Sequence, residues 1–312
     1  MAARILVTGG AGFIGSSIVE ALLKRVDAVT VLDDFSTGRE SNLLGLSGDL
    51  VVLRGDVSNA MDVKRAMSDV RAVFHEAAIP SVVRSGNEPV VADRVNVHGT
   101  VTVLEEARNS GVERVVFAAS AAAYGDEPTL PKLESMTPSP LSPYAVAKIA
   151  GEHYMRVYAN LHGMKTLSLR YFNVFGGKQD PKSEYAAAIP RFVAAIRDGY
   201  APTVFGDGLQ TRDFCHVSDV VAANLNALEC SDARGQVVNI ARGESTTIVD
   251  LIQMIARVMK KTVTPKHNAE RAGDIKHSLA DIRAAKSLLA WEPAMGVEAG
   301  MHETVLGLTH SR

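Results

Sequence analysis

The chain has 312 residues, of which 46% are hydrophobic and 22% charged, and its formal net charge is −2. This composition is typical of an ordinary globular protein with a large core. The near-neutral charge gives no electrostatic footprint for nucleic acid or an anionic membrane, so neither is an expected partner. No apolar run is long enough to cross a bilayer, and a glycine turn comes too early for a signal peptide. The two cysteines, Cys215 and Cys230, are too few for a disulfide framework or a zinc cluster, and we expect reduced core thiols in a cytoplasmic protein.

Short apolar runs alternate with helical patterns through the first half of the chain. The strand-like runs are residues 4–8, 28–32, 50–53, 72–75, 114–119 and 166–170. Between them apolar residues recur at helical spacing, as in Ile14, Ile18 and Leu22. This alternation predicts an α/β protein with a parallel sheet that helices cover on both faces.

From about residue 171 the pattern loosens into loops and short helices separated by prolines. Residues 237–241 read as a further buried strand, which we expect to return to the first sheet, and residues 248–259 as an amphipathic helix. We therefore predict a cofactor domain of residues 1–170, joined by the strand near 237–241. Residues 171–312 are expected to form most of a small, discontinuous second lobe.

A glycine loop connects the first strand to the first helix. Gly9, Gly12 and Gly15 permit a tight turn, close approach of a pyrophosphate and close helix–sheet packing. The helix N-terminus adds unpaired N–H groups and a partial positive charge. Asp33 ends the second strand, where its carboxylate can accept both hydroxyls of an adenosine ribose and would repel a 2′-phosphate. The loop and this acid predict NAD, in preference to NADP, as the cofactor.

Further polar residues follow the second and third strands. Asp34 and Ser36 are expected to help hold the ribose, and Asp56 and Val57 to flank the adenine. The alternative for Asp56 is a loop carboxylate that caps the next helix.

Tyr144 and Lys148 form a Tyr-x-x-x-Lys pair behind this loop. Ser142 is a plausible N-cap and Pro143 favours a first helical turn, so the two side chains lie on one helix face. A tyrosine hydroxyl has a reference pKa of about 10. A neighbouring ammonium lowers that pKa and favours the phenolate. The pair therefore predicts a catalytic base.

These features together resemble the extended short-chain dehydrogenase/reductase superfamily, and within it most closely the UDP-hexose 4-epimerases. The resemblance rests on the glycine loop, Asp33, residues 120–125 and the Tyr144/Lys148 pair, with further similarity in residues 170–176 and 206–214. It extends from Gly9 to about Trp291. It implies a Rossmann-type doubly wound parallel sheet with a small C-terminal substrate lobe.

The resemblance also implies roles for individual residues. Ser120 is expected to hydrogen-bond the reacting oxygen beside Tyr144. The remaining cofactor contacts implied are Phe13, Ile14, Gly38, Ala77, Ala78, Asn96, Tyr144, Lys148 and Tyr171. The substrate contacts implied are Ser81, Arg84, Ser120, Tyr144, Asn173, Arg212, Arg271 and Ser278. Arg212 and Arg271 match two arginines that clamp a sugar-nucleotide diphosphate, a task that suits the planar guanidinium.

Some positions depart from relatives or leave alternatives open. Pro80 stands near a position where relatives have a lysine, which puts one cofactor contact in doubt. Tyr124 is expected either near the nicotinamide or in the core. His75, His216 and His277 do not form a set with metal-ligand spacing, so no metal is predicted.

Two alanines disfavour some of the reactions that this superfamily catalyses. Related 4,6-dehydratases and UDP-glucuronate decarboxylases carry acids where this chain has Ala121 and Ala122, which cannot transfer a proton. This favours NAD-dependent 4-epimerisation of UDP-hexoses. The alternatives are a UDP-glucuronate 4-epimerase, another NDP-sugar redox enzyme, or an NAD-binding sensor without catalysis.

Two further predictions concern specificity and assembly. The resemblance places Ser278 at the wall of the sugar pocket, where a small residue admits a 2-N-acetyl group, so UDP-GlcNAc and UDP-GalNAc are expected substrates beside UDP-Glc and UDP-Gal. Helices over residues 96–109 and 143–162 are expected to pair with a second copy in a homodimer.

Overall fold

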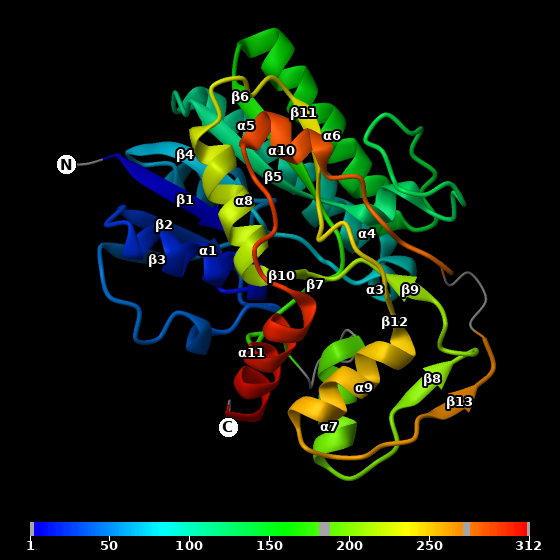
Figure 1. The fold of residues 1–312 in the computed structure, drawn as a ribbon. Helices are drawn as coiled ribbons and strands as arrows, with labels where there is room; N and C mark the ends of the chain where they lie inside the picture. The colour runs from blue at the N-terminus through cyan, green and yellow to red at the C-terminus, as the bar shows by residue number, and fades with distance from the viewer. Residues whose placement is uncertain (1–2, 181–187, 271–274, 311–312) are drawn as a thin grey trace.

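A computed structural model describes residues 3–180, 188–270 and 275–310 of the chain. Its centre is a seven-stranded parallel sheet in the order β11-β6-β5-β4-β1-β2-β3 (Figure 1). The strands are β1 (Arg4–Thr8), β2 (Val29–Asp33), β3 (Leu50–Arg54), β4 (Val70–His75), β5 (Arg114–Ser120), β6 (Lys165–Tyr171) and β11 (Gln236–Ile240). The predicted strands are therefore present, with ends that differ by one or two residues.

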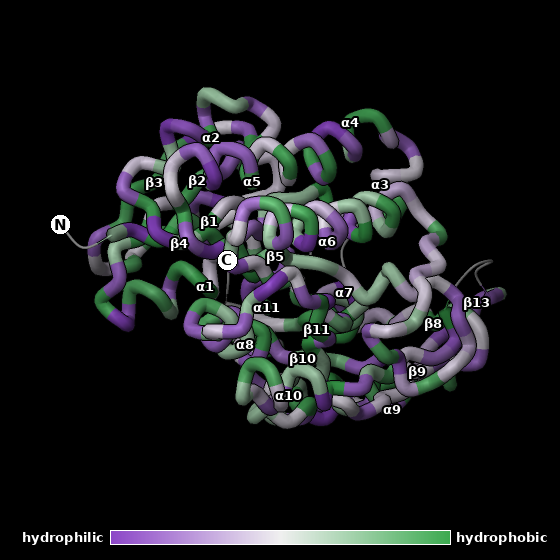
Figure 2. The backbone as a smooth tube through the Cα atoms, turned by 90° about the horizontal axis from the view of Figure 1, so that it is seen from above, coloured by the Kyte–Doolittle hydropathy of each residue, from purple (hydrophilic) through white to green (hydrophobic). Residues whose placement is uncertain are grey.

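Helices cover the two faces of this sheet (Figure 2). One face carries α1 (Phe13–Lys24), α8 (Val217–Glu229) and α10 (Arg283–Leu289), and the other carries α2 (Ala60–Ala66), α5 (Gly99–Asn109) and α6 (Pro143–His162). Each face buries its own apolar cluster against the helices. The prediction of a sheet covered on both faces is confirmed, and the edge strand β3 is its least covered part, with Val51 and Val52 41% and 43% exposed.

Short helical segments connect the strands near the carboxyl edge of the sheet. They are η1 (Glu40–Asn42), α3 (Val82–Asn87), α4 (Pro89–Asp93), the π-turn η2 (Arg94–His98) and η3 (Ala121–Tyr124). The π-turn delays the start of the regular helix α5 to Gly99, so the helix predicted over residues 96–109 is shorter than expected.

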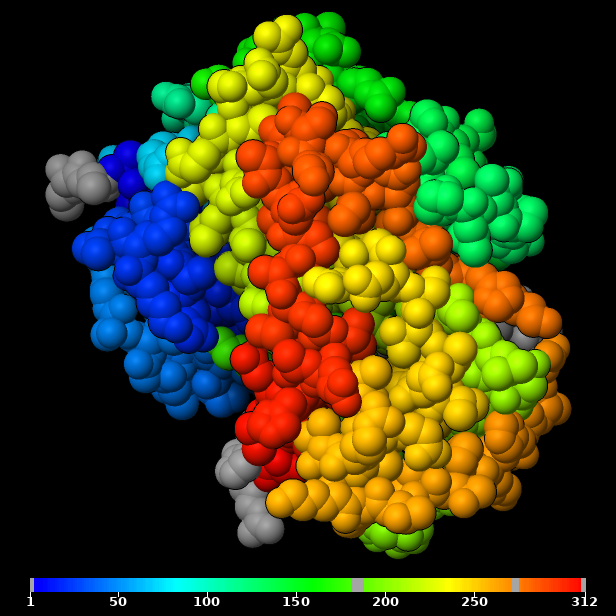
Figure 3. Space-filling model, viewed as in Figure 1, coloured from blue at the N-terminus to red at the C-terminus, as the bar shows by residue number. Residues whose placement is uncertain are grey.

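The rest of the chain builds a lobe with its own apolar cluster. Its elements are β7 (Val174–Phe175), α7 (Ala188–Arg197), β8 (Thr203–Phe205), β9 (Thr211–Arg212), β10 (Cys215–His216), β12 (Thr246–Thr247), α9 (Ile248–Val258), β13 (Lys266–Asn268) and α11 (Val297–His310). In the space-filling view α11, drawn in red, lies between the blue N-terminal part and the gold α9 region (Figure 3).

Strand β11 returns from this lobe to the main sheet. It pairs in parallel with β6, with Asn239 opposite Arg170 and Ile240 opposite Tyr171, which confirms the predicted return. The division of the chain into two domains near residue 170 stays a prediction. Among the helices that the structure describes, none combines the length and apolarity needed to span a bilayer.

Candidate active site

The glycine loop has the shape that a pyrophosphate requires. Gly9 has φ +67°, and the Gly12 amide donates to Gly9 O at 3.0 Å, which closes a tight turn. A Cβ on Gly9 would lie 2.7 Å from Ala77 N, and one on Gly15 would overlap Gly9 O, so both positions need glycine. Helix α1 starts without a side-chain cap and without an acidic residue in its first turn. Its first N–H groups therefore favour an anion at this point. These residues fit a dinucleotide.

Asp33 lies at the end of β2, as predicted, and is 7% exposed. Its two carboxylate oxygens accept hydrogen bonds from Ala11 N and Phe35 N, both at 2.8 Å. A Cβ on Gly38 would come within 2.7 Å of Asp33 Oδ1, so this glycine keeps the carboxylate accessible. Each carboxylate oxygen has a further lone pair, which can accept a hydrogen bond from a ribose hydroxyl.

The other predicted ribose and adenine residues form local turns. Asp34 accepts a hydrogen bond from Ser36 N at 2.8 Å, and both residues are exposed. Asp56 Oδ1 accepts from the amide and the hydroxyl of Ser58, both at 2.8 Å. The helix-capping alternative for Asp56 is wrong, because Asn59 caps α2 by accepting from Met61 N.

The loop after β4 is fixed by Asn96. Its side-chain oxygen accepts from Ile79 N at 2.8 Å, and its amide nitrogen donates to Ile79 O at 3.1 Å. Asn96 is almost fully buried, and Ala77 N donates to Thr8 Oγ1 at 3.3 Å. Asn96 therefore fixes the loop after β4 at Ile79, and its direct contact with the cofactor stays a prediction.

Ser81 and Arg84 lie at the start of α3. Ser81 caps this helix by accepting from Arg84 N at 3.0 Å, and the Arg84 guanidinium donates to Glu88 at 3.1 Å. Both side chains thus have structural partners at the border of the crevice.

Tyr144 and Ser120 meet at the carboxyl end of β5. Pro143 stands in the first turn of α6, and Ser142 caps it by accepting from Ala145 N at 3.2 Å, as predicted. The Ser120 side chain lies beside the Tyr144 phenol and opposes the rise in its pKa that burial causes. Lys148 lies one turn further on, with Nζ 5.8 Å from the Tyr144 ring centroid, and it donates to Ala118 O at 2.6 Å. The structure thus brings the three predicted catalytic residues together.

The pKa of Tyr144 differs from the sequence prediction. Burial raises the pKa of this phenol, and the Ser120 side chain opposes the rise. Burial also lowers the pKa of the Lys148 ammonium, to about 8. That pKa leaves most of the ammonium protonated at neutral pH, so Lys148 keeps its positive charge near the Tyr144 ring.

Two residues near this cluster were missed by sequence reasoning. Ser85 is fully buried, accepts a hydrogen bond from Tyr144 N at 3.2 Å and donates to Val82 O at 2.7 Å. Glu76 accepts a hydrogen bond from the Tyr171 hydroxyl at 2.8 Å. No sequence spacing links these residues to Tyr144, because they reach it from other elements.

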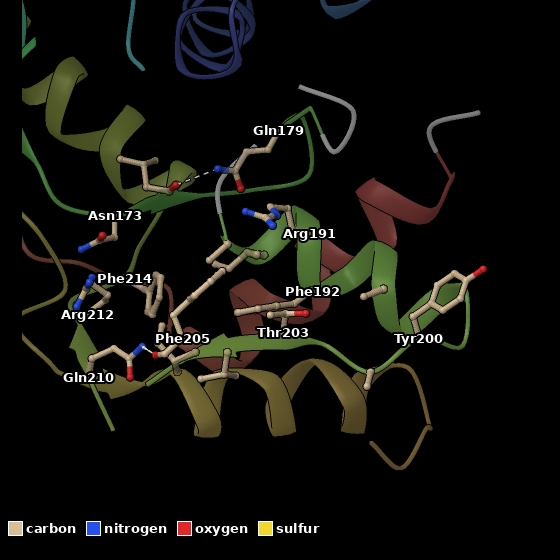
Figure 4. A pocket seen from close by; sticks show the side chains of 17 residues that line it. Asn173, Gln179, Arg191, Phe192, Tyr200, Thr203, Phe205, Gln210, Arg212 and Phe214 are labelled. Carbon is tan, nitrogen blue, oxygen red and sulfur yellow. Dashed lines mark hydrogen bonds between the residues drawn. The ribbon is translucent and has the colours of Figure 1, made fainter. Parts of the chain in front are cut away.

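A cavity of about 520 Å³ lies in the second lobe, between α7, β8, β9 and α9 (Figure 4). Asn173 and Arg212 stand at one end of it, Arg191 points into its middle, and Phe205 and Phe214 supply aromatic surface. The guanidinium of Arg212 donates to Thr211 O at 2.9 Å. Arg191 was not among the predicted substrate residues. The predicted Arg271 lies outside the described residues.

Ser278 lies beside this cavity and does not line it. Its backbone amide donates to Thr211 O at 3.1 Å, next to Arg212. The structure therefore places the expected gatekeeper one residue away from the predicted diphosphate contact.

Asp213 joins the segments around the substrate residues. Its fully buried carboxylate accepts from the amides of Arg242, Gly243 and Ala280 at 2.8 to 3.2 Å, and its carbonyl accepts from Asn173 Nδ2 at 3.0 Å. Burial raises the pKa of Asp213 to about 6 against these hydrogen bonds. This hub was not predicted, since its partners are far apart in sequence.

The ambiguous aromatic and histidine residues are structural. Tyr124 is buried, donates to Asn239 at 2.6 Å and stacks under Arg170, so the core alternative is correct. His75 lies between the Thr8 and Thr100 hydroxyls, and burial lowers its pKa to about 3. His216 caps α8. Within residues 3–180, 188–270 and 275–310, no group of three or more His, Cys, Asp or Glu residues could hold a metal ion.

Comparisons with known proteins agree with this geometry. The model of the NAD dependent epimerase/dehydratase family matches residues 5–241. The UDP-glucose 4-epimerase of Mycolicibacterium smegmatis is 37% identical over 307 residues, which cover 97% of each chain. A UDP-N-acetylglucosamine 4-epimerase from Methanobrevibacter ruminantium, solved with UDP-N-acetylmuramic acid, superposes with a TM-score of 0.94 at 37% identity and 99% coverage of both chains. A UDP-glucose 4-epimerase from Thermotoga maritima, solved with UDP-glucose, gives a TM-score of 0.93 at 35% identity and 98% coverage of both chains.

Proposed function

The chain belongs to the NAD dependent epimerase/dehydratase family, and from that premise we propose that it is an NAD-dependent UDP-hexose 4-epimerase. The observation that carries the proposal is the grouping of Tyr144 with Ser120 and Lys148 at the carboxyl end of β5, in a chain whose glycine loop fits a dinucleotide. A protein that only sensed the cofactor would need none of these three side chains.

The residues of the chain divide the chemistry among them. NAD, when bound, supplies the group that takes hydride from C4 of the sugar and returns it to the other face. Tyr144 removes the proton from the 4-hydroxyl and gives it back after the 4-keto sugar has turned. Ser120 holds the reacting oxygen. Lys148 orients the ribose, and its Nζ lies 5.8 Å from the centroid of the Tyr144 ring. Because burial raises the pKa of Tyr144, the phenol needs nearby positive charge to work as a base, and the Lys148 ammonium supplies one.

While the nucleotide part of the substrate stays bound, the 4-keto sugar can rotate without dissociating from the protein. We propose that Arg212 and Arg271 hold the diphosphate, with Arg191 as a further contact, since it points into the cavity. Planar guanidinium groups bind phosphate oxygens in pairs. Binding energy at this remote group can retain the keto intermediate through its rotation.

Ser278 supports turnover of N-acetylated sugars. It is a small residue on the segment that runs beside Thr211 and Arg212, and serine leaves the volume that a tyrosine ring would fill. The similar Methanobrevibacter ruminantium protein is a UDP-N-acetylglucosamine 4-epimerase. We therefore infer activity on UDP-GlcNAc and UDP-GalNAc as well as on UDP-Glc and UDP-Gal.

A deuterium label tests the reaction. The protein, without added NAD, is incubated with a panel of UDP-sugars labelled at C4, and the products are resolved by mass and by configuration. We expect C4 epimers that retain the label, because the hydride is borrowed and returned. Loss of the label, or reduced cofactor that accumulates in step with product, would point to a dehydrogenase. Product from UDP-glucuronate alone would favour the glucuronate epimerase, and no product with any sugar would favour a sensor.

The homodimer and the cytoplasmic location are further proposals. On α6, Tyr154 and Val157 are exposed, which suits a homodimer built on this helix, whereas Leu104 of α5 is buried within its own subunit. A monomer mass that is independent of concentration would refute the dimer. The cytoplasmic location rests on the sequence prediction, with Cys215 and Cys230 as free buried thiols.

A further inference from the structure

Glu76 stands at the carboxyl edge of the sheet and has no part in the mechanism above. It directly follows β4, and its amide donates to Thr8 O at 3.1 Å. A Cβ on Gly9 would lie 2.9 Å from the Glu76 carbonyl carbon, so this acid is a direct neighbour of the glycine loop. Its side chain is half-buried.

A one-way chain of hydrogen bonds orients the carboxylate. Asn224, from α8, donates from Nδ2 to the Tyr171 hydroxyl at 2.8 Å, and that hydroxyl donates to Glu76 Oε1 at 2.8 Å. A phenol has one proton to give, so in this arrangement Tyr171 gives it to Glu76. Both Tyr171 and Asn224 are buried, and this fixes the carboxylate against the end of the sheet.

This chain of hydrogen bonds passes across the carboxyl end of β5, where the proposed reaction occurs. Strand β5 lies between β4 and β6, and its last residue, Ser120, is paired in register with Tyr171. The bond from Tyr171 to Glu76 therefore spans the carboxyl end of β5, where Ser120 lies beside Tyr144. Hydride transfer requires the nicotinamide ring within about 3–3.5 Å of the sugar carbon at this same point.

The charge of Glu76 responds to its surroundings. Burial raises the pKa of its carboxyl to about 7, while the Tyr171 hydrogen bond and the positive charge of Lys148 oppose the rise. A second cation near this carboxyl would favour its ionised form further.

We propose that Glu76 is the counter-charge of the nicotinamide ring and favours the oxidised, cationic cofactor over the reduced, neutral one. An epimerase must return the hydride that it takes. A carboxylate that stabilises the oxidised ring makes the transfer of this hydride back to the sugar more favourable. Charge placed beside a cofactor ring is a recognised means of tuning it. The proposal rests on the proposed function only in requiring NAD at this site.

The test compares binding of the two cofactor forms without any sugar. Wild type and Glu76→Gln are equilibrated with mixtures of NAD⁺ and NADH, and the bound ratio is read from the near-ultraviolet absorbance of the reduced ring. Glutamine keeps the size and the acceptor for Tyr171 but removes the charge. We expect the bound ratio to shift about tenfold toward NADH, which is the scale of one charge at the dielectric of a partly buried site.

Matched variants separate charge from structure. Asp232→Asn removes the charge of an exposed carboxylate in the loop before β11, so its ratio should stay near that of wild type. If Glu76→Gln is unstable, Glu76→Leu tests the same loss of charge with a similar volume. An unchanged ratio in a folded, cofactor-binding neutral variant would overturn the proposal, as would an equal shift in Asp232→Asn. Because no substrate is used, these outcomes are independent of the deuterium experiment.

Discussion

The glycine loop and the cavity of the second lobe are the two proposed phosphate sites, and they are assembled in different ways. The loop is a contiguous stretch, Gly9 to Gly15, whose ligand groups are backbone amides and a helix N-terminus. The cavity takes side chains from α7, β8, β9 and α9, and Asp213, which follows β9, accepts hydrogen bonds from amides far along the chain. A short sequence motif can encode a binding site that consists of backbone groups. A binding site made of side chains from several elements depends instead on how distant segments pack.

Tyr144 belongs to neither region but carries the proposed proton transfer, and we expect the largest effect there. Tyr144→Phe keeps the ring but removes the proton carrier, so epimerisation should fall about 10²–10⁴-fold or more. Resolved product after timed incubation gives the rate, and bound NAD and circular dichroism should stay as in wild type. Tyr154→Phe, an exposed tyrosine on the same helix, is the control and should be near wild type. Near-native turnover in Tyr144→Phe would sink the mechanism.

Gly15 tests the claim that the loop works through its backbone. In Gly15→Ala the added methyl overlaps Gly9 O, and overpacking of this kind costs about 1–3 kcal/mol. We expect NAD affinity, measured by calorimetry, to fall about 10–100-fold. Gly86→Ala adds a methyl to open space in α3 and should change little. Equal NAD affinities in Gly15→Ala and Gly86→Ala would contradict the claim that the loop works through its backbone.

Ser278 tests whether side chains beside the cavity select the sugar. Ser278→Tyr should lower activity on N-acetylated sugars at least about tenfold more than activity on plain hexoses, because excluding a whole group should cost more than a missing methylene does. The measurement is kcat/KM for UDP-GlcNAc and UDP-Glc. Ser278→Ala keeps the space and should retain both activities. An equal fall in both would show that Ser278 is not the gatekeeper.

Asp213 tests the hub of the cavity, and its expected effect is the smallest. In Asp213→Asn an amide NH₂ replaces one carboxylate oxygen and faces a backbone donor, so one of three hydrogen bonds is lost at a cost of about 1–3 kcal/mol. We expect a lower free energy of unfolding in urea and a KM several-fold higher, with kcat little changed. Asp207→Asn changes an exposed acid in the same loop and serves as the control. A raised KM in both variants alike would argue against a hub.

The parts of the molecule that were predicted share a local origin. The strands, the capped start of α6, the glycine loop and the position of Asp33 follow from neighbouring residues, because propensity, capping and burial act over one or two turns. The predicted chemistry of Tyr144 was wrong in one respect. Its pKa depends on burial, which the sequence around it does not report.

By itself the sequence determined the α/β fold, the dinucleotide loop and the identities of Ser120, Tyr144 and Lys148, since these depend on periodicity and on short motifs. Only the tertiary structure decided that Asn96 holds a loop, that Asp56 does not cap a helix and that Ser85 positions Tyr144. It also decided that Glu76 meets Tyr171 across the end of β5 and that Asp213 ties three segments together. The physical reason is distance along the chain. Hydrogen bonds and desolvation act between groups that are close in space, and packing of the sheet brings together residues that no local pattern connects.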